Sequence, residues 1–317
     1  MNPLTVRAAR RCMAAMNASP TLAAEHPEVA PAAFDLRRAS PKDRPPPTPL
    51  VFASPHSGRC YPQDMMAAAA LDALAIRRSE DAFVDALIAD APDLGASVIA
   101  ARLARAYIDV NREPFELDAT MFADELPEFA RARTARVAAG LGAIARVVSE
   151  GQEIYARKLT FAEASLRIEL AHRPYHAALA DLIAEAKAEH GFAILVDWHS
   201  MPAAAARSQG VSRPADVVLG DRFGAACSHL LTARLERGFE ELGYRVARNV
   251  PYAGGHTTAH YGRPEAGVHA LQVEINRALY LDEAQVAPTP GFERLKGHLA
   301  RLTQSLAEAD WGAFRVA

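Results

Sequence analysis

The chain has 317 residues, of which 50% are hydrophobic and 23% are charged, and its formal net charge at pH 7 is −3. This composition is typical of a globular protein, and the slightly acidic balance gives no support for a nucleic-acid or anionic-membrane partner. No apolar run approaches the ~20 residues that a membrane-spanning helix needs.

The first 48 residues are predicted to be an extension outside the globular domain. Residues 1–24 are rich in Ala and Arg, but they lack the continuous apolar core and cleavage site of a targeting peptide. Residues 25–48 include the run Pro45-Pro46-Pro47, which is typical of a linker or surface arm. We therefore expect one domain over residues 49–317. The three widely spaced cysteines form no CxxC pair, which favours a reducing, cytoplasmic setting.

Alternating apolar and amphipathic segments predict a single α/β domain whose mixed, mostly parallel sheet is flanked by helices. Strands are expected at 49–54, 98–101, 106–110, 192–197, 217–220 and 270–275, with 245–247 at an edge of the sheet. Helices are expected to begin at an N-cap at Ser79, to dominate residues 135–190, and to cover 227–242 and 290–309. Residues 203–214 are predicted to be a mobile loop. Because ligands bind outside the carboxyl ends of strands in such sheets, polar residues at those ends are the candidates for a site.

Two histidines follow apolar runs, as a metal site at the edge of the sheet requires. His56 lies in Ser54-Pro55-His56-Ser57-Gly58, where Pro55 fixes the turn and Gly58 permits a close backbone approach. His199 lies in Asp197-Trp198-His199-Ser200. Either histidine alone could simply end a turn or a strand, but the pair favours a metal.

A catalytic zinc site needs a third protein ligand and an open fourth position. The adjacent acids Glu80 and Asp81 are the nearest source of a carboxylate in the sequence. Both acids could instead favour a helix N-terminus through its dipole.

Glu274 interrupts the apolar strand Ala270–Ile275. A buried Glu costs several kcal/mol unless it is paired, protonated or used. An ion pair with Arg277 would be a structural explanation. We favour a function, as general base on a metal-bound water.

Two further segments carry candidate substrate contacts. Asn111 and Arg112 end an expected strand, and Arg112 could clamp a substrate carboxylate, although a salt bridge to Glu113 or Glu116 would also explain it. A polar loop with paired glycines is expected over residues 254–264. Its candidate contacts are Thr257, Thr258, His260 and Arg263.

These motifs together resemble the N-formylglutamate amidohydrolase family, in order from about residue 49 to about residue 305. The segments that carry the resemblance are residues 54–58, 79–85, 107–114, 173–176, 197–202, 254–262 and 269–277. The resemblance implies a zinc-carboxypeptidase-like α/β fold. It maps His56 and His199 onto metal ligands and Glu274 onto the catalytic glutamate.

Two positions of this chain differ from the sequence motifs of the related enzymes. Zinc carboxypeptidases carry a metal-binding Glu three residues after the first His, where this chain has Arg59. The carboxylate must therefore come from elsewhere, and the resemblance favours Asp81 over Glu80. His256 stands where an aromatic residue is expected, so it is not counted as a ligand.

The resemblance implies zinc-dependent hydrolysis of N-formyl-L-glutamate to formate and L-glutamate, a reaction of histidine degradation. The partner would then be a small N-acyl amino acid. Iron, cobalt or nickel would also suit imidazole and carboxylate ligands. One alternative is a deacylase of another N-acyl amino acid or a short peptide. The other is a non-catalytic metal- or amino-acid-binding protein, against which the joint presence of His56, His199 and Glu274 argues.

Overall fold

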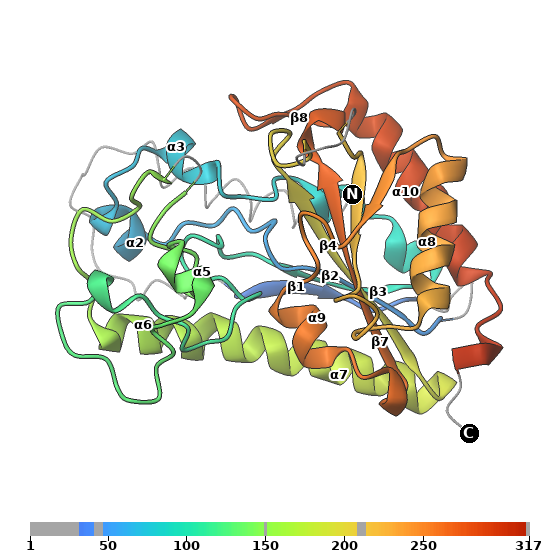
Figure 1. Ribbon diagram of the computed structural model, residues 1–317, viewed down its shortest axis with the longest axis horizontal. Helices are drawn as coiled ribbons and strands as arrows, with labels where there is room; N and C mark the ends of the chain where they lie inside the picture. The colour runs from blue at the N-terminus through green and yellow to red at the C-terminus, as the bar shows by residue number, and fades with distance from the viewer. Residues whose placement is uncertain (1–31, 41–46, 149–150, 208–213, 315–317) are drawn as a thin grey trace.

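A seven-stranded mixed sheet runs through the centre of the structure, a computed structural model that describes residues 32–40, 47–148, 151–207 and 214–314 (Figure 1). The strand order is β1-β3-β2-β4-β7-β5-β6. The strands are β1 Phe34–Arg37, β2 Leu50–Ser54, β3 Ser97–Ala101, β4 Ala193–Met201, β5 Val217–Gly220, β6 Val246–Arg248 and β7 Val268–Asn276. The central β3-β2-β4-β7 strands are parallel, whereas β1 and β5 pair antiparallel to β3 and β7. The predicted single α/β domain with a mostly parallel mixed sheet is therefore confirmed.

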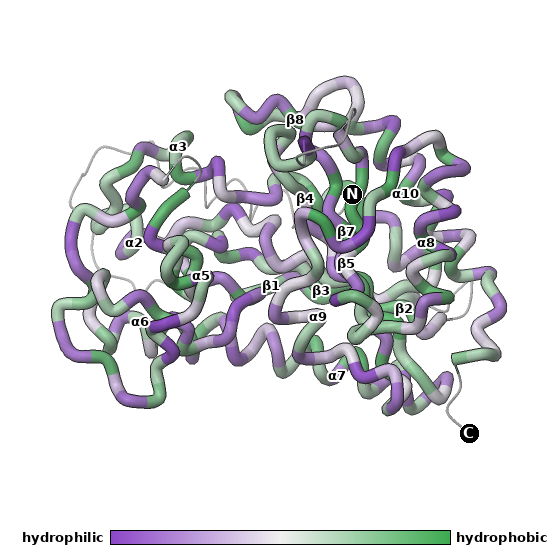
Figure 2. The backbone as a smooth tube through the Cα atoms, in the orientation of Figure 1, coloured by the Kyte–Doolittle hydropathy of each residue, from purple (hydrophilic) through white to green (hydrophobic). Residues whose placement is uncertain are grey.

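Helices cover both faces of the sheet, so its central strands are buried along their whole length and largely apolar (Figure 2). On one face α7 (Arg173–His190) packs against Val51 and Ala53 of β2. On the other face α4 (Val84–Leu87), α8 (His229–Glu241) and α10 (Gly291–Ala307) pack against Leu50 and Phe52. Successive residues of β2 thus serve opposite helical layers, as the two-residue period of a strand requires.

A second, smaller apolar cluster lies beside the sheet, on the left of Figure 1. Its core includes Met65, Ile76, Leu117, Ile144 and Leu159. The remaining elements are the short helices α2 Gln63–Ala68, α3 Ala73–Arg77, α5 Ala135–Ala138, α6 Phe161–Arg167 and α9 His256–Tyr261, the π-helical turn Ile168–His172, and the hairpin of β8 Leu281–Asp282 and β9 Ala287–Pro288. In the described part of the chain, no helix is long and apolar enough to cross a membrane.

Strand β1 lies within the segment that the sequence predicted to be an arm. Phe34 and Leu36 pack against the core, while Asp35 and Arg37 are exposed. This alternation fits an edge strand, and the neighbouring prolines hid it. Residues 1–24 lie outside the described residues, as do residues 208–213 of the expected mobile loop.

The expected strand at 106–110 is wrong. Tyr107 and Ile108 form turns by donating backbone hydrogen bonds to Ala104, and Asp109 donates to the carbonyl of Ala143. Ile108 is buried in the apolar cluster beside the sheet, whereas Val110 is buried in the cluster between the sheet and α7. The apolar residues of this segment therefore divide between two packing layers, and its backbone stays outside the sheet.

Two helix predictions also need correction. The Ser79 hydroxyl donates to the carbonyl of Ile76 and closes α3, and the next helix begins only after Phe83, at φ 64°. Between residues 135 and 160, Gly140 at φ 77° ends the short α5, so the continuous helical region runs only from Phe161 to His190. The expected loop at 254–264 contains the short helix α9.

The turn that carries His56 depends on Gly58, whose backbone lies directly against the next segment. A Cβ added at Gly58 would lie 2.1 Å from the carbonyl oxygen of Leu103, a backbone atom that cannot give way cheaply. We expect Gly58→Ala to destabilise the fold by about 1–3 kcal/mol, which chemical denaturation can measure. Gly297→Ala is the matched control, since it lies in α10 with no atom within 4 Å of the added Cβ. It should stabilise the protein by up to ~1 kcal/mol. Equal stability of Gly58→Ala and the parent protein would contradict this account.

Candidate metal centre and active-site cavity

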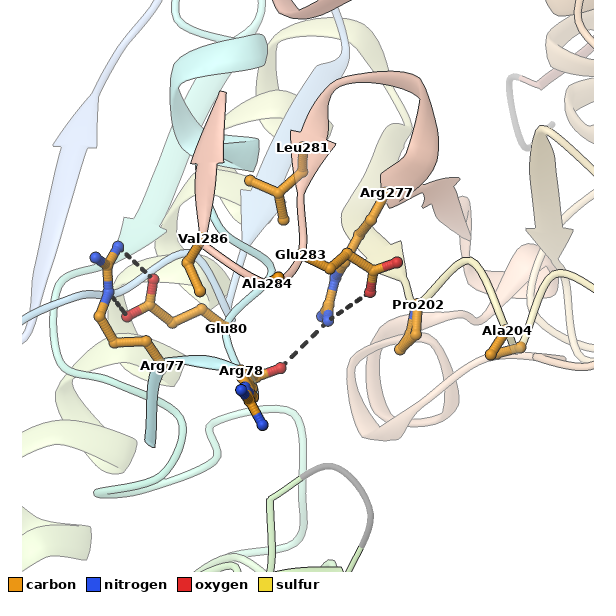
Figure 3. A pocket seen from close by; sticks show the side chains of 11 residues that line it. Arg77, Arg78, Glu80, Pro202, Ala204, Arg277, Leu281, Glu283, Ala284 and Val286 are labelled. Atoms are coloured by element: carbon orange, nitrogen blue, oxygen red, sulfur yellow. Dashed lines mark hydrogen bonds and ion pairs between the residues drawn. The ribbon is translucent and has the colours of Figure 1, made fainter. Parts of the chain in front are cut away.

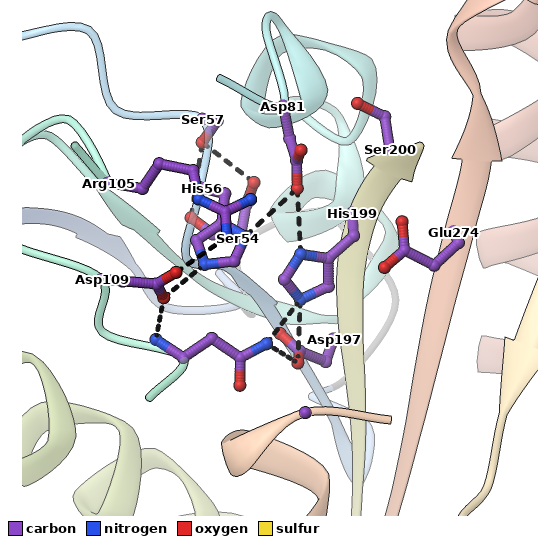
Figure 4. Close-up of polar contacts among 12 residues, drawn as sticks. Ser54, His56, Ser57, Asp81, Arg105, Asp109, Asp197, His199, Ser200 and Glu274 are labelled. Atoms are coloured by element: carbon purple, nitrogen blue, oxygen red, sulfur yellow. Dashed lines mark hydrogen bonds and ion pairs between the residues drawn. The ribbon is translucent and has the colours of Figure 1, made fainter. Parts of the chain in front are cut away.

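The two histidines meet at the carboxyl edge of the sheet because β2 and β4 are parallel neighbours. Ala53 lies opposite Asp197 in this pairing, which brings His56 and His199 together just beyond it. The Asp81 Oδ2 atom lies 2.9 Å from His199 Nδ1 and 3.4 Å from His56 Nδ1 (Figure 4). Each residue offers one ligand atom, and these atoms lie within 4.8 Å of one another. All three side chains are buried.

The chemistry of this cluster fits a divalent cation. His56 Nδ1 is buried and has no hydrogen-bond partner within the described residues, although Asp81 is near. Burial would raise the pKa of Asp81, but the hydrogen bond to His199 and the nearby His56 imidazole hold it well below its usual value. A buried carboxylate between two imidazoles therefore calls for positive charge. Two nitrogens and one oxygen leave a fourth position open, which is the donor set of a catalytic zinc site.

Two carboxylates fix the imidazoles from behind. Asp109 Oδ1 lies 2.6 Å from His56 Nε2, and Asp197 Oδ2 lies 3.0 Å from His199 Nε2. Each contact leaves the Nδ1 atom facing Asp81, an arrangement that orients imidazole ligands in metal sites. Neither Asp109 nor Asp197 is among the site residues expected from the sequence. An acidic residue next to an apolar run was the available signal, the same one that drew attention to Glu274.

The structure separates the two candidate acids of the 80–81 pair. Glu80 turns away from the cluster, where it accepts hydrogen bonds from Tyr61 and Arg77. Asp81 faces the histidines, and its other oxygen, Oδ1, accepts from Arg277 Nη2 at 2.9 Å. Arg277 therefore orients Asp81 with Oδ2 toward the imidazoles.

Glu274 lies opposite His199 in the pairing of β4 with β7, and it lines the same cavity. Burial raises its pKa to about 7. The structural explanation by an ion pair with Arg277 does not hold, because the Arg277 guanidinium contacts Asp81 and Ser200 instead. The hydrogen bond to Glu274 in this structure comes from Gln272 Nε2, at 2.8 Å.

The cavity around this cluster has a volume of about 670 Å³ and carries an excess of positive charge. Five arginines line it against three carboxylates. They are Arg78, Arg105, Arg112, Arg136 and Arg277, against Asp81, Asp109 and Glu274. Such a lining favours an anionic ligand.

Asn111 and Arg112 both line the cavity, as predicted for substrate contacts. The Asn111 amide is nevertheless engaged by the protein. Its oxygen accepts from the Thr257 N–H at 2.8 Å, and its nitrogen lies 3.0 Å from His199 Nε2. Arg112 donates to the carbonyls of Leu141 and Asn111, and its nearest acid is Asp109 at 3.9 Å. The suggested salt bridge to Glu113 or Glu116 is not formed, because those acids contact Arg131 and Arg136.

The other predicted substrate contacts are not brought to the cavity. The Thr258 hydroxyl bonds to the carbonyl of Gly255, the His260 ring stacks on His256, and Arg263 binds the carbonyls at the end of α9. Thr257 reaches the site only through its backbone N–H to Asn111. Thr257, Thr258 and His260 belong to α9, and the side chains of Thr258 and Arg263 bind backbone carbonyls at its two ends.

A second cavity of about 750 Å³ lies beyond Arg277 (Figure 3). Its lining includes Leu281, Glu283 and Val286, and it shares Arg78, Pro202 and Arg277 with the first cavity. The imidazoles and Glu274 line only the smaller cavity, so the candidate chemistry belongs there.

Comparisons with known proteins agree with the motifs. A family model described as N-formylglutamate amidohydrolase matches residues 48–281. An N-formylglutamate deformylase of Pseudomonas aeruginosa is 32% identical over 238 residues, which cover 74% of this chain and 83% of that protein. One of Pseudomonas putida is 30% identical over 272 residues, which cover 84% and 94%.

Solved structures give the same result. The crystal structure of N-formylglutamate amidohydrolase from Ralstonia eutropha JMP134 is 39% identical, covers 87% of this chain and 98% of that one, and superposes with a TM-score of 0.81. A protein of Agrobacterium tumefaciens, 19% identical over 87% of this chain and 95% of its own, shares the fold with a TM-score of 0.61.

The geometry predicts which acid holds a cation. Asp81→Asn should lower the metal bound per chain at least 10-fold, because it removes the charge between the imidazoles. Glu80→Gln should leave the metal content unchanged, since Glu80 faces Arg77. Elemental analysis of the purified variants measures both. Full metal content in Asp81→Asn, or its loss in Glu80→Gln, would contradict the arrangement.

Proposed function

The chain belongs to the N-formylglutamate amidohydrolase family, and from this premise we propose that it hydrolyses N-formyl-L-glutamate to formate and L-glutamate. The observation that carries the proposal is the meeting of His56, Asp81, His199 and Glu274 in one cavity with an excess of arginines. The named relatives act on the same compound according to their names.

Residues His56, Asp81 and His199 would hold one divalent metal, most suitably zinc. A metal held there supplies Lewis acidity toward a carbonyl oxygen and a water molecule. Asp109 and Asp197 would keep the Nδ1 atoms aimed at the centre through the contacts described above.

Glu274 is the proposed general base. A carboxylate with a pKa of about 7 can accept a proton at neutral pH and give it up again. It would take a proton from the water that attacks the formyl carbon and deliver it to the nitrogen as the C–N bond breaks. The products are then formate and the free amino group of glutamate.

The arginines are proposed to bind the two carboxylates of the substrate. Arg112 is the candidate for the α-carboxylate, because it lines the cavity close to Asn111 and His199. For the side-chain carboxylate the candidate is Arg78 and not Arg263, because Arg263 binds the carbonyls at the end of α9. Arg78 lines the cavity, and no ion pair of its guanidinium is found within the described part of the chain.

Two alternative functions can be distinguished from the proposed one by experiment. A deacylase for another N-acyl amino acid would use the same centre and differ only in the fit of the acyl group. A non-catalytic binding protein would need no buried carboxylate facing the cavity without an ion pair, and Glu274 argues against it. Hydrolysis assays with N-formyl-, N-acetyl- and N-succinyl-amino acids, glutamate among them, separate the three cases.

Glu274→Gln should lose activity while it keeps the fold and the metal. The amide has nearly the same shape but cannot accept the proton, and loss of a general base commonly costs about 100- to 10,000-fold in rate. The measurements are kcat on N-formyl-L-glutamate and metal content of the same preparation. Near-normal turnover would return Glu274 to a structural role.

Substitutions of Arg112 and Arg78 should affect different substrates, because each arginine is proposed to bind a different carboxylate. Arg112→Lys keeps the positive charge but loses the planar guanidinium that can make two parallel hydrogen bonds to a carboxylate. kcat/KM should therefore fall about 10- to 150-fold for N-formylglutamate and much less for its α-amide. Arg78→Met should show the corresponding loss for N-formylglutamate but little change for N-formylglutamine, which lacks the side-chain carboxylate. An equal effect on acid and amide would remove that arginine from carboxylate binding.

A further inference from the structure

Two imidazoles outside the metal centre hold the segment that carries Asn111. His172 ends the π-helical turn Ile168–His172, and His176 lies one turn further along α7. His172 Nε2 lies 2.8 Å from the carbonyl oxygen of Arg112, and His176 Nε2 lies 2.7 Å from that of Val110. The two carbonyls on either side of Asn111 are therefore held by the same helical face.

The hydrogen bonds fix the tautomer of each imidazole. A carbonyl oxygen can only accept, so both Nε2 atoms must carry a hydrogen and donate. His176 Nδ1 is then an acceptor, and the Tyr261 hydroxyl lies 2.8 Å from it. Burial lowers the pKa of His176 to about 3, which keeps it neutral in this role at physiological pH.

The segment needs these donors because it lies outside the sheet. A strand at 106–110 would have satisfied its carbonyls by ladder hydrogen bonds, but the chain forms turns there. A buried carbonyl without a hydrogen-bond partner destabilises the fold. The imidazoles provide the partners and at the same time fix where the segment stands.

The third support comes from α9. Its Tyr261 hydroxyl contacts His176, and the Thr257 N–H donates to the Asn111 oxygen. With its oxygen held by α9, the Asn111 amide nitrogen faces Asp197 Oδ2 at 3.4 Å and can donate to it. The same carboxylate oxygen lies 3.0 Å from His199 Nε2, so Asn111 helps to fix the group that orients this imidazole. The helices α7 and α9, which lie close together in Figure 1, thus act on one side chain.

We propose that His172 and His176 are positioning residues that act on His199 through Asn111 and its partner Asp197, setting the orientation of the His199 imidazole toward the metal. This inference rests on the proposed function only in requiring a metal at His56, Asp81 and His199. It deepens that proposal by assigning a role to the imidazoles beside the cavity.

The test uses paired amide substitutions on the full-length protein. The Gln side chain places its NH₂ group near the position of imidazole Nε2, whereas Asn reaches only the position of Nδ1. His172→Asn and His176→Asn should each lower the affinity for Zn²⁺, measured by competition with a chelator, about 10-fold. kcat/KM on N-formylglutamate should fall by a similar factor. His172→Gln and His176→Gln should restore most of both. His190→Asn, on the same helix, is the control, since its nearest acid is the adjacent Glu189 at 4.0 Å; it should change neither.

A double-mutant cycle tests whether the effect passes through Asn111. In an Asn111→Ala background, His176→Asn should change Zn²⁺ affinity less than 2-fold, because the residue it positions is gone. A merely structural role would instead give the same loss in both backgrounds. Such an additive result, or equal behaviour of the Gln and Asn variants, overturns the inference.

The two proposals fail in different ways. Zn²⁺ binding without hydrolysis of N-formylglutamate would overturn the proposed substrate, while the cycle in Zn²⁺ affinity still decides the role of the histidines. A parent protein that neither binds Zn²⁺ nor hydrolyses the substrate overturns both.

Discussion

A buried carboxylate between two buried imidazoles is the constraint on which the rest of the site depends. Asp81 is almost fully removed from water, at 2% exposure, and desolvation of a charge is costly unless other groups compensate. Arg277 compensates on one oxygen, and His56 and His199 face the other. Negative charge continues behind the imidazoles in Asp109 and Asp197, so the centre is built to receive a cation.

Strand pairing delivers these groups to one place. The parallel register of β2 with β4 aligns the two histidines, and that of β4 with β7 sets Glu274 beside His199. The side chains of His56, His199 and Glu274 lie at or next to the ends of adjacent strands, so no conformational change is needed to bring them together. The sheet can therefore fix Glu274 relative to the two histidines, while the Arg277 side chain orients Asp81.

The other wall of the cavity is made differently. The segment from Tyr107 to Arg112 has no strand to order it, and side chains from α7 and α9 hold it through its carbonyls and through Asn111. The two arginines proposed to bind substrate carboxylates, Arg112 and Arg78, lie in this wall and in the turn before α4. The sheet thus holds the candidate reacting groups, and the helical and irregular parts hold the groups proposed to select the ligand.

The sequence by itself indicated the α/β class, six of the seven strands, and the candidate residues His56, His199 and Glu274. Of these strands, β4 extends to Met201, four residues beyond its expected end. The strands and candidate residues are encoded locally, because a buried strand needs a continuous apolar run and a polar residue at its end is conspicuous. The residues themselves did not decide whether Asp81 or Glu80 faces the histidines, since both precede the same helix. Their ion pairs decide it, because Glu80 pairs with Arg77 and Asp81 with Arg277. The tertiary structure also decided that residues 106–110 form turns, that Arg263 caps α9, and that Asp109 and Asp197 stand behind the imidazoles. Each of these depends on contacts between segments far apart in the chain, which neither periodicity nor composition records.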